Sequence, residues 1–417
     1  MTPAEAPPGA GLVVLPRSPS RERGPLTPLI TSAGWASAMT ARFGFSPLYT
    51  LDGPLTIEAA LRHPVREATQ APAGTGDARA AVRSGVTTAV KDLRRLVEAR
   101  RFRAPVLAAA RSGPAPALVW QRHELFHDAG LRAAAALGRP VVLSMHASLV
   151  REATDWGTLR PGFAGLAERR GERPIVQRAD VVACVSEEVA ADAARLGADP
   201  RRIVVTPNAV DAERFRPGLD GTVTRARYGL EGRFVVGWSG SFRRFHGLDA
   251  LVDAVAALEH RDDVTLLLVG DGAQRSVIEA RAAALGVRCT VTGAVPHTEV
   301  PALLAAMDVG VVTDAPVGDF HYSPVKLREY LAIGLPTIAP AVGDVARWVT
   351  DGSQALLFDR LHPDELTRAL QRLRDQPALR HALATSGRDL VERTGSWSSR
   401  LDLVLAALDA AGPQPAR

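Results

Sequence analysis

Short apolar runs alternate with helical segments through both halves of this 417-residue chain, and this alternation restricts its possible folds more than any other feature. Most runs end close to Gly, Asp or Pro, and helical periodicity follows before the next run begins. Strands that alternate with helices in this way predict βαβ units, whose strands pair in parallel. The predicted strands lie in residues 11–17, 46–50, 115–123, 139–149, 181–185 and 203–205, at the start of 232–255, and in 264–272, 289–295, 309–316, 335–340 and 355–360.

The chain is too long for one hydrophobic core, because single cores stop growing at about 250–300 residues. We therefore expect two α/β domains of similar size. The Pro- and Gly-rich stretch RPGLDG, residues 216–221, reads as the linker between them. This gives an N-terminal domain in residues 1–216 and a C-terminal domain in residues 217–396. A last apolar-periodic helix, residues 397–411, is expected to pack back on the N-terminal domain.

The composition is that of a globular protein, with 46% hydrophobic and 23% charged residues. No apolar run approaches 18 residues, and the N-terminus MTPAEAPPGAG lacks the basic start and apolar core of a signal peptide. We therefore expect a cytoplasmic protein. The abundance of Ala and Arg indicates a bacterial source with a high genomic GC content.

Positive charge is concentrated in the N-terminal half. Residues 1–216 contain 29 Lys and Arg against 21 Asp and Glu, whereas the remainder contains 21 against 24. The most basic stretch, KDLRRLVEARRFR (residues 91–103), predicts a surface helix that packs on a sheet through Leu93, Leu96 and Val97. The alternative is contact with an acidic acceptor or with an anionic membrane, which would place the protein peripherally at the inner membrane face. Nucleic acid is not expected, because the arginines are scattered and aromatic residues total only 5%.

The stretch SPVKLREYLAIGLP, residues 323–336, predicts a short helix with an anion at its start. Ser323 suits the capping position and Pro324 the first helical position. The unpaired N–H groups and the helix dipole favour an anion at that end. Lys326 opposes the dipole there, and the chain has only one other lysine, Lys91. A phosphate between the helix end and Lys326 would satisfy both.

Glu329 follows Lys326 by three residues and so lies on the same face of this helix. A carboxylate there can accept hydrogen bonds from a pair of sugar hydroxyls, so the stretch predicts phosphate and then ribose. The alternative is an exposed ion pair between Lys326 and Glu329, which would contribute little to stability.

A second anion site is predicted in the loop GSFRRFHG, residues 240–247, which follows one predicted strand and precedes a helix. Gly240 lets the backbone approach a ligand closely, and Arg243, Arg244 and His246 supply hydrogen-bond donors.

His146 lies near the carboxyl end of the predicted strand 139–149. Open α/β sheets bind ligands outside the carboxyl ends of their strands, so His146 is a candidate site residue. The alternative is a rim histidine that is hydrogen-bonded within the fold.

Several motifs of other nucleotide- or metal-dependent proteins are incomplete or missing. GDGAQR, residues 270–275, begins like a dinucleotide fingerprint, but Arg275 stands where the third glycine belongs. Ser323 and Lys326 fit an SxxK pattern, yet the accompanying KTG is impossible when the only other lysine is Lys91. We find no Walker A motif, HExxH motif, DxD pair or Cys/His ligand spacing. Neither a metal ion nor a bound cofactor is therefore expected.

Taken together, these stretches resemble the GT-B glycosyltransferases of the large retaining group called family 4, over most of the chain. Residues 179–217 resemble the family's passage into the second domain, where Asn208 and Asp211 stand in an Asn-Gly-Val-Asp turn whose glycine is Ala209 here. Residues 122–153 are similar to its N-terminal passage with a histidine at a strand end. The resemblance implies two Rossmann-like domains whose parallel sheets face an interdomain cleft.

The resemblance also implies roles for individual residues. His146 would contact the donor sugar near its anomeric carbon as the catalytic residue, and Glu329 would hold the ribose of the nucleotide. The family's first Glu of the Glu-x7-Glu motif is His321 here, and we expect His321 near the donor sugar or base together with Gly270, Asp271 and Val295. The donor diphosphate would be bound by Gly240, Ser241, Arg243, His246, Ser323, Pro324, Val325 and Lys326.

The chain departs from the family pattern in both domains. Ser241 and His246 replace the Arg and Lys that many members carry in the phosphate-binding loop. The Gly-rich acceptor loop after the first strand is replaced by LPRSPSRERGPLTP, residues 15–28.

The implied function is metal-independent transfer of a sugar, with retention, from a nucleoside-diphosphate sugar to a hydroxyl of a glycan, glycolipid or natural product. Two alternatives stay open. One is a catalytically silent GT-B protein that binds a nucleotide or partner, which is suggested by His321 and Ser241. The other is a GT-B sugar-nucleotide epimerase or phosphorylase.

Overall fold

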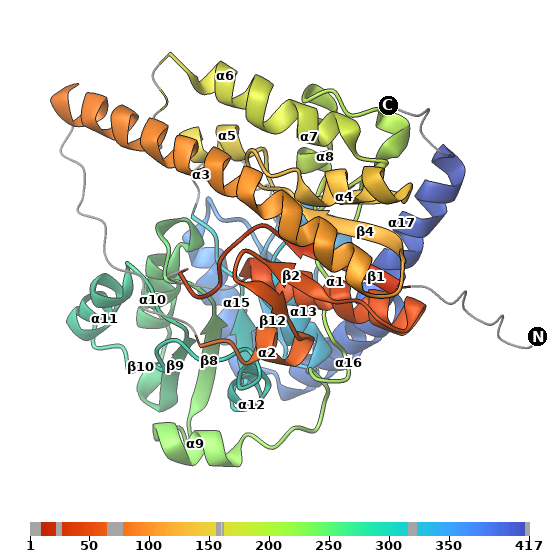
Figure 1. Ribbon diagram of the computed structural model, residues 1–417. Coiled ribbons are helices and arrows are strands. Elements are labelled where there is room, and N and C mark those ends of the chain that lie inside the picture. The colour runs from red at the N-terminus through yellow and green to blue at the C-terminus, as the bar shows by residue number, and fades with distance from the viewer. Residues whose placement is uncertain are drawn as a thin grey trace, which may run out of the picture.

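A computed structural model describes residues 10–21, 27–64, 78–155, 160, 162–315 and 323–412, and of residues 78–84 it describes the backbone only. Each half of the chain builds one sheet with helices around it, and the two resulting lobes lie one above the other in Figure 1. The predicted α/β class with two Rossmann-like, parallel-sheet units is therefore confirmed.

The N-terminal sheet has seven strands in the order β3-β2-β1-β4-β5-β6-β7, and all neighbours pair in parallel except β2 and β3. Its elements are β1 (Ala10–Leu15), α1 (Thr27–Phe43), β2 (Leu48–Thr50), β3 (Gly53–Leu55), α2 (Ile57–Leu61), α3 (Ala78–Ser112), β4 (Pro116–Arg122), α4 (Ala129–Leu137), β5 (Val141–Met145), α5 (Leu149–Asp155), α6 (Ala164–Ala167), the π-helix η1 (Glu168–Glu172), α7 (Arg173–Arg178), β6 (Val181–Cys184), α8 (Glu187–Arg195), η2 (Pro200–Arg202) and β7 (Ile203–Val205). The short antiparallel strand β3 was not predicted from the sequence.

The C-terminal sheet has six parallel strands in the order β10-β9-β8-β11-β12-β13. Its elements are α9 (Thr222–Tyr228), β8 (Phe234–Ser239), η3 (Arg244–His246), α10 (Leu248–Ala256), η4 (Arg261–Asp263), β9 (Val264–Val269), α11 (Arg275–Ala284), β10 (Cys289–Val291), α12 (Val300–Leu304), β11 (Val309–Val311), α13 (Val325–Ala332), β12 (Thr337–Pro340), α14 (Gly343–Trp348), β13 (Leu356–Phe358), α15 (Pro363–Asp375) and α16 (Pro377–Thr394). A final helix, α17 (Trp397–Ala411), follows.

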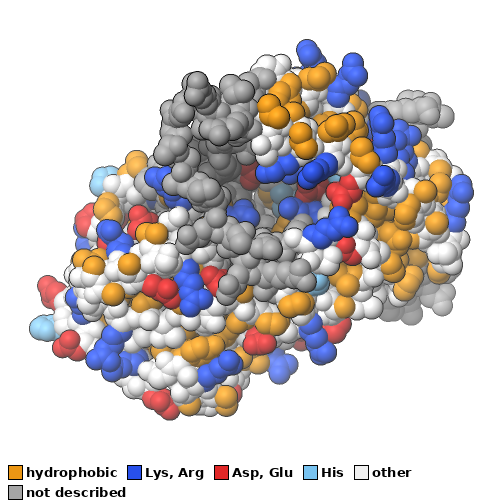
Figure 2. Space-filling model, turned by 60° about the vertical axis from the view of Figure 1, so that its left-hand side comes forward, with side chains coloured by type: hydrophobic (Ala, Val, Ile, Leu, Met, Phe, Trp, Pro, Cys, Tyr) orange, Lys and Arg blue, Asp and Glu red, His pale blue; other side chains and the backbone are white. Residues whose placement is uncertain are grey.

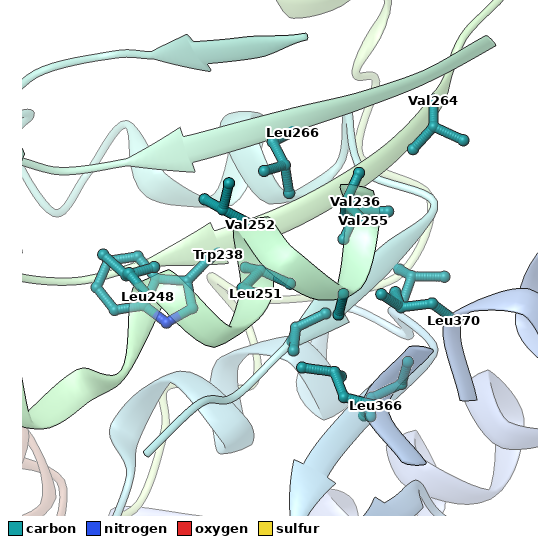
Figure 3. Packing of buried hydrophobic residues seen from close by; sticks show 14 of the residues in the cluster. Val236, Trp238, Leu248, Leu251, Val252, Val255, Val264, Leu266, Leu366 and Leu370 are labelled. Atoms are coloured by element: carbon teal, nitrogen blue, oxygen red, sulfur yellow. The ribbon is translucent and has the colours of Figure 1, made fainter. Parts of the chain in front are cut away.

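Each sheet is covered on both faces, as parallel sheets require. Strand β8 illustrates this, because Val236 and Trp238 pack into one core whereas Val235, on the opposite face, packs into another. Figure 3 shows the first of these cores, in which Leu251 of α10 and Leu370 of α15 lie against the sheet. Packing on both faces therefore holds the strand ends in place. The positions of the loops that follow the strands are fixed as a result.

The long helix α3 departs from the sequence prediction. Leu93, Leu96 and Val97 were expected to pack on the sheet, but Leu93 and Val97 are 62% and 40% exposed, and only Leu96 is half-buried. The face of α3 that packs inward instead carries Asp92, Ala99 and Phe102. The carboxylate of Asp92 can lie on this buried side because it forms an ion pair with Arg160. Figure 2 shows hydrophobic side chains next to Lys and Arg side chains on the upper part of the face in view. No helix in the described ranges is long and apolar enough to cross a membrane.

Helix α17 packs on the N-terminal lobe although it follows α16, which contacts α13 in the C-terminal lobe. The rings of Trp397 and Trp35 meet edge to face with their centroids 5.1 Å apart. Gly34 permits this approach, since a Cβ at that position would lie 2.3 Å from the Trp397 ring. Ser396 caps the helix by accepting a hydrogen bond from the Ser399 N–H at 3.1 Å.

We predict that Trp397→Ala will lower the stability of the N-terminal lobe by about 3–5 kcal/mol, the usual cost of removing a buried aromatic side chain. Urea unfolding followed by circular dichroism would measure this loss. Leu403→Ala on the same helix is the matched control and should change stability by less than about 0.5 kcal/mol, because Leu403 is 46% exposed. Equal effects of both changes would contradict the packing described for α17.

Candidate functional site

A cavity of about 840 Å³ lies between the lobes, and residues from both sheets line it. All sequence-predicted site residues within the described ranges border this one cavity: His146, Gly240, Ser241, Arg243, His246, Gly270, Asp271, Val295, Ser323, Pro324, Val325, Lys326 and Glu329. His321 lies outside the described residues. The cavity is bordered by the carboxyl ends of strands from each sheet, where ligands of parallel α/β sheets bind.

Ser323 does not cap α13, contrary to the prediction. The helix begins at Val325, Pro324 occupies the capping position, and no side chain caps the first turn. The Ser323 hydroxyl is engaged elsewhere, because it donates a hydrogen bond to Asp344 Oδ2 at 2.8 Å and accepts one from the Asn208 N–H at 3.1 Å. The first turn of α13 therefore has no side-chain cap at its N–H groups and borders the cavity.

Asn208 joins the two lobes at this point. Besides the contact of its backbone, its side-chain Nδ2 donates a hydrogen bond to the Ser323 carbonyl at 2.7 Å. Asp344 also accepts a hydrogen bond from the buried Arg328 Nη2 at 2.7 Å. The start of α13 is thus fixed both to its own lobe and to the chain segment that follows β7.

Two glycines bring the loops after β8 and β9 into close contact. Gly240 has φ of +145° and donates its N–H to the Val269 carbonyl at 2.9 Å. A Cβ at Gly270 would lie only 1.9 Å from the Gly240 carbonyl oxygen. No other residue can take the place of Gly270 without moving one of these loops. Glycine at positions 240 and 270 is thus explained by the backbone geometry of the cavity wall.

Lys326 is half-buried beside the loop after β8, and its Nζ is shielded from solvent. Its Nζ lies 3.6 Å from the centroid of the Trp238 ring and has no hydrogen-bond partner in the described part of the chain. Burial holds the pKa of the Lys326 ammonium well below its ordinary value, while the nearby Glu329 acts in the opposite direction. The alternative of an exposed ion pair between Lys326 and Glu329 is therefore wrong.

Glu329 is hydrogen-bonded to a histidine that the sequence reasoning did not select. Oε1 of Glu329 lies 2.7 Å from His297 Nε2, and Oε2 accepts no hydrogen bond from the described residues. His297 follows β10 by a few residues and packs against Phe215, with ring centroids 5.4 Å apart. Its position just beyond a strand end is the same signal that drew attention to His146. The pair leaves one carboxylate oxygen of Glu329 available at the cavity wall.

His146 follows β5 and lines the N-terminal wall of the cavity. Its Nε2 lies 3.3 Å from the Ser144 hydroxyl oxygen. Burial lowers the pKa of His146 well below its ordinary value, and the neighbouring Arg122 and His123 act in the same direction. The imidazole is therefore neutral near pH 7, a form in which one ring nitrogen donates a hydrogen bond and the other accepts one.

His246 occupies the end of the loop after β8, where it packs between the rings of Trp238 and Phe245. Burial lowers the pKa of His246 well below its ordinary value, and Lys326 and Arg243 contribute in the same direction. Asp271, after β9, is held by Arg275 Nη1 at 3.2 Å from its Oδ2. No group of three or more His, Cys, Asp or Glu residues in the described ranges could hold a metal ion.

Two family models match the chain, one in each lobe. The model "Glycosyltransferase Family 4" matches residues 59–214, and the model "Glycosyl transferases group 1" matches residues 233–376. These matches cover the elements that carry His146 and those that carry Lys326 and Glu329.

Curated relatives are similar to the chain over much of its length. A D-inositol 3-phosphate glycosyltransferase of Catenulispora acidiphila is 31% identical over 305 residues, which cover 69% of this chain and 71% of the relative. A 2-deoxystreptamine glucosyltransferase of Streptomyces kanamyceticus is 34% identical over 225 residues, which cover 52% of this chain but only 57% of that protein.

Solved structures share the fold. HepE from Anabaena in complex with UDP and glucose superposes with a TM-score of 0.66 at 18% identity, covering 96% of this chain and all of that one. A sucrose-phosphate synthase from Thermosynechococcus elongatus gives a TM-score of 0.66 at 19% identity, with coverage of 97% and 100%. At this level of identity the likeness concerns the arrangement of the two lobes alone.

Proposed function

The chain belongs to the GT-B glycosyltransferases of family 4, and from this premise we propose that it transfers a sugar from a nucleoside-diphosphate sugar to an acceptor hydroxyl. The observation that carries the proposal is the half-buried Lys326, whose Nζ is shielded from solvent and lacks a hydrogen-bond partner among the described residues, beside the first turn of α13, which no side chain caps. An anion between these groups would satisfy both.

We propose that the donor diphosphate binds at the start of α13 and in the loop after β8. Val325 and Lys326 border the cavity from one side, and Gly240, Ser241 and Arg243 border it from the other. Positive side chains and helix N–H groups there would stabilise the negative charge that grows on the leaving diphosphate. In this proposal, these side chains and N–H groups neutralise the diphosphate charge without a metal ion.

Glu329 would hold the ribose through the oxygen that His297 leaves available. His146, which is neutral, would donate or accept one hydrogen bond at the donor sugar, across the cavity from Lys326. We propose retention by attack from the face of the departing phosphate, whose oxygen would accept the proton of the acceptor hydroxyl. Proton NMR of the product would reveal the anomeric configuration, and an inverted product would contradict this step.

The relatives suggest a class of acceptor. The names of the two relatives contain 2-deoxystreptamine and inositol 3-phosphate, and both compounds are cyclitols. We propose that a cyclitol or similar polyol binds on the N-terminal wall of the cavity, near His146.

The donor site can be tested by thermal unfolding with UDP, GDP, ADP and dTDP, each with EDTA and with magnesium. At 100 times Kd a true ligand adds about 2.7 kcal/mol, which corresponds to a rise in Tm of roughly 5–10 °C for domains of this size. We expect one nucleotide to produce this rise, equally with EDTA, and Glu329→Ala to remove most of it. Glu231→Ala, an exposed residue of the same lobe, is the control. No rise with any nucleotide would contradict the proposal.

Binding of the diphosphate should be coupled to proton uptake at Lys326. Burial lowers the pKa of the ammonium in the free protein, and a bound diphosphate raises it again, so binding takes up a proton at any pH between the two values. Affinity should therefore fall as the pH rises through this interval. Titration calorimetry in buffers of different ionisation enthalpy would measure the uptake.

Lys326→Met should abolish this proton uptake and weaken nucleotide binding about ten- to hundredfold, the range for hydrogen bonds to charged groups. Lys91→Met changes the only other lysine, which is exposed on α3, and should leave both quantities unchanged. Equal proton uptake in wild type and Lys326→Met would show that another group titrates.

We also infer that the exposed face of α3 can bind an anionic membrane. Val90, Leu93 and Val97 are exposed at helical spacing, and Arg94 and Arg101 lie beside them on the same helix. Co-sedimentation should show binding to phosphatidylglycerol vesicles but not to phosphatidylcholine vesicles, and Leu93→Glu should reduce it severalfold. Equal binding of both vesicle types, or of Leu93→Glu and wild type, would contradict this inference.

A further inference from the structure

The N-terminal wall of the cavity carries more arginine than carboxylate. Its charged residues within the described ranges are Arg17, Arg95, Arg122, Arg160, Glu124 and Glu152. Arg17 Nη1 lies 3.0 Å from Glu124 Oε1, so these two charges offset each other. Counted as a whole, this wall carries four guanidinium groups against two carboxylates.

Two of these arginines share one aspartate that does not itself line the cavity. Oδ1 of Asp92 accepts hydrogen bonds from Arg95 Nη1 at 3.3 Å and from Arg160 Nη2 at 3.2 Å. Oδ2 of Asp92 accepts a hydrogen bond from Arg160 Nε at 2.8 Å. One carboxylate cannot neutralise two guanidiniums, so this group of three keeps a net positive charge beside the cavity.

Arg160 is the better buried of the two arginines. Its side chain is only 2% exposed, and its Nη1 is buried without a hydrogen-bond partner among the residues that the structure describes. An unpaired buried donor on a charged group is costly, and the fold tolerates it here beside an open cavity. A guanidinium with a vacant N–H edge matches the oxygens of a phosphate or carboxylate.

We propose that the acceptor carries an anionic group, a phosphate or a carboxylate, which binds to Arg160 and Arg95. This inference rests on the proposed function and deepens it, because it specifies the charge of the acceptor. A cyclitol with amino groups would meet a wall of its own sign, whereas a phosphorylated one would complete the hydrogen bonds of Arg160. The anionic group anchors the acceptor on the N-terminal lobe while a hydroxyl points toward the donor.

The test uses the full chain saturated with the nucleotide identified above, so that the donor site is filled. Titration calorimetry with inorganic phosphate should show saturable binding to wild type. Arg160→Gln should weaken this binding at least about tenfold, as expected for a charge-assisted hydrogen bond. Arg201→Gln is the control, because Arg201 is an exposed arginine of the same lobe that pairs with Asp199 outside the cavity.

Three cyclitols that differ in charge extend the test: inositol 3-phosphate, myo-inositol and 2-deoxystreptamine. The phosphate should bind at least tenfold more tightly than the other two, and inorganic phosphate should compete with it. Nucleotide binding in Arg160→Gln checks that the variant is folded, and Arg95→Gln, at a half-exposed side chain, should show the same trend more weakly.

The outcomes separate the two proposals. Absence of nucleotide binding would overturn the proposed function itself. Nucleotide binding without saturable phosphate binding, or with equal phosphate binding in wild type and Arg160→Gln, would overturn the anionic acceptor alone. Tighter binding of 2-deoxystreptamine than of the phosphorylated cyclitol would overturn it as well.

Discussion

Two hydrogen bonds between Asn208 and Ser323 fix one wall of the cavity against the other. Asn208 follows the last strand of the N-terminal sheet, and Ser323 precedes α13, so the bonds connect the lobe that holds His146 with the helix that holds Lys326 and Glu329. Because Ser323 is engaged in this way, it leaves the first turn of α13 uncapped. The same contact therefore positions the lobes and keeps the helix end open to a ligand.

The Nζ of Lys326, at the cavity wall, has no hydrogen-bond partner among the described residues. Lys326 rests on the face of Trp238, which attracts a cation but cannot replace a counter-ion. On the opposite wall Arg160 keeps one buried donor that has no partner within the described part of the chain. Such groups lower the stability of the free protein, and costly local features of this kind cluster at active sites and ligand-binding sites. Each wall thus offers a nitrogen donor of the kind that a substrate pair with two anionic groups would require.

Much of the architecture could be predicted because parallel βαβ units leave a strong pattern in the sequence. The apolar runs located the strands, and their polar carboxyl ends located His146 and the loop 240–247. The relation between side chains that are distant in sequence could not be predicted. The pairing of His297 with Glu329 spans 32 residues, and Ser323 lost its capping role to contacts with Asn208 and Asp344. The apolar residues of α3 also misled the prediction, since Asp92 faces inward only because Arg160 neutralises it from another loop.

The packing of α17 has a mechanical consequence. The chain passes from the N-terminal to the C-terminal lobe after β7 and returns before Trp397, and these two crossings lie side by side, since the Val210 N–H donates a hydrogen bond to the Gly395 carbonyl at 3.0 Å. Two adjacent crossings of the chain resist sliding and separation of the lobes far more than they resist bending about the line on which both crossings lie. The two adjacent connections therefore favour one relative movement of the lobes, a hinge rotation about the line that joins them.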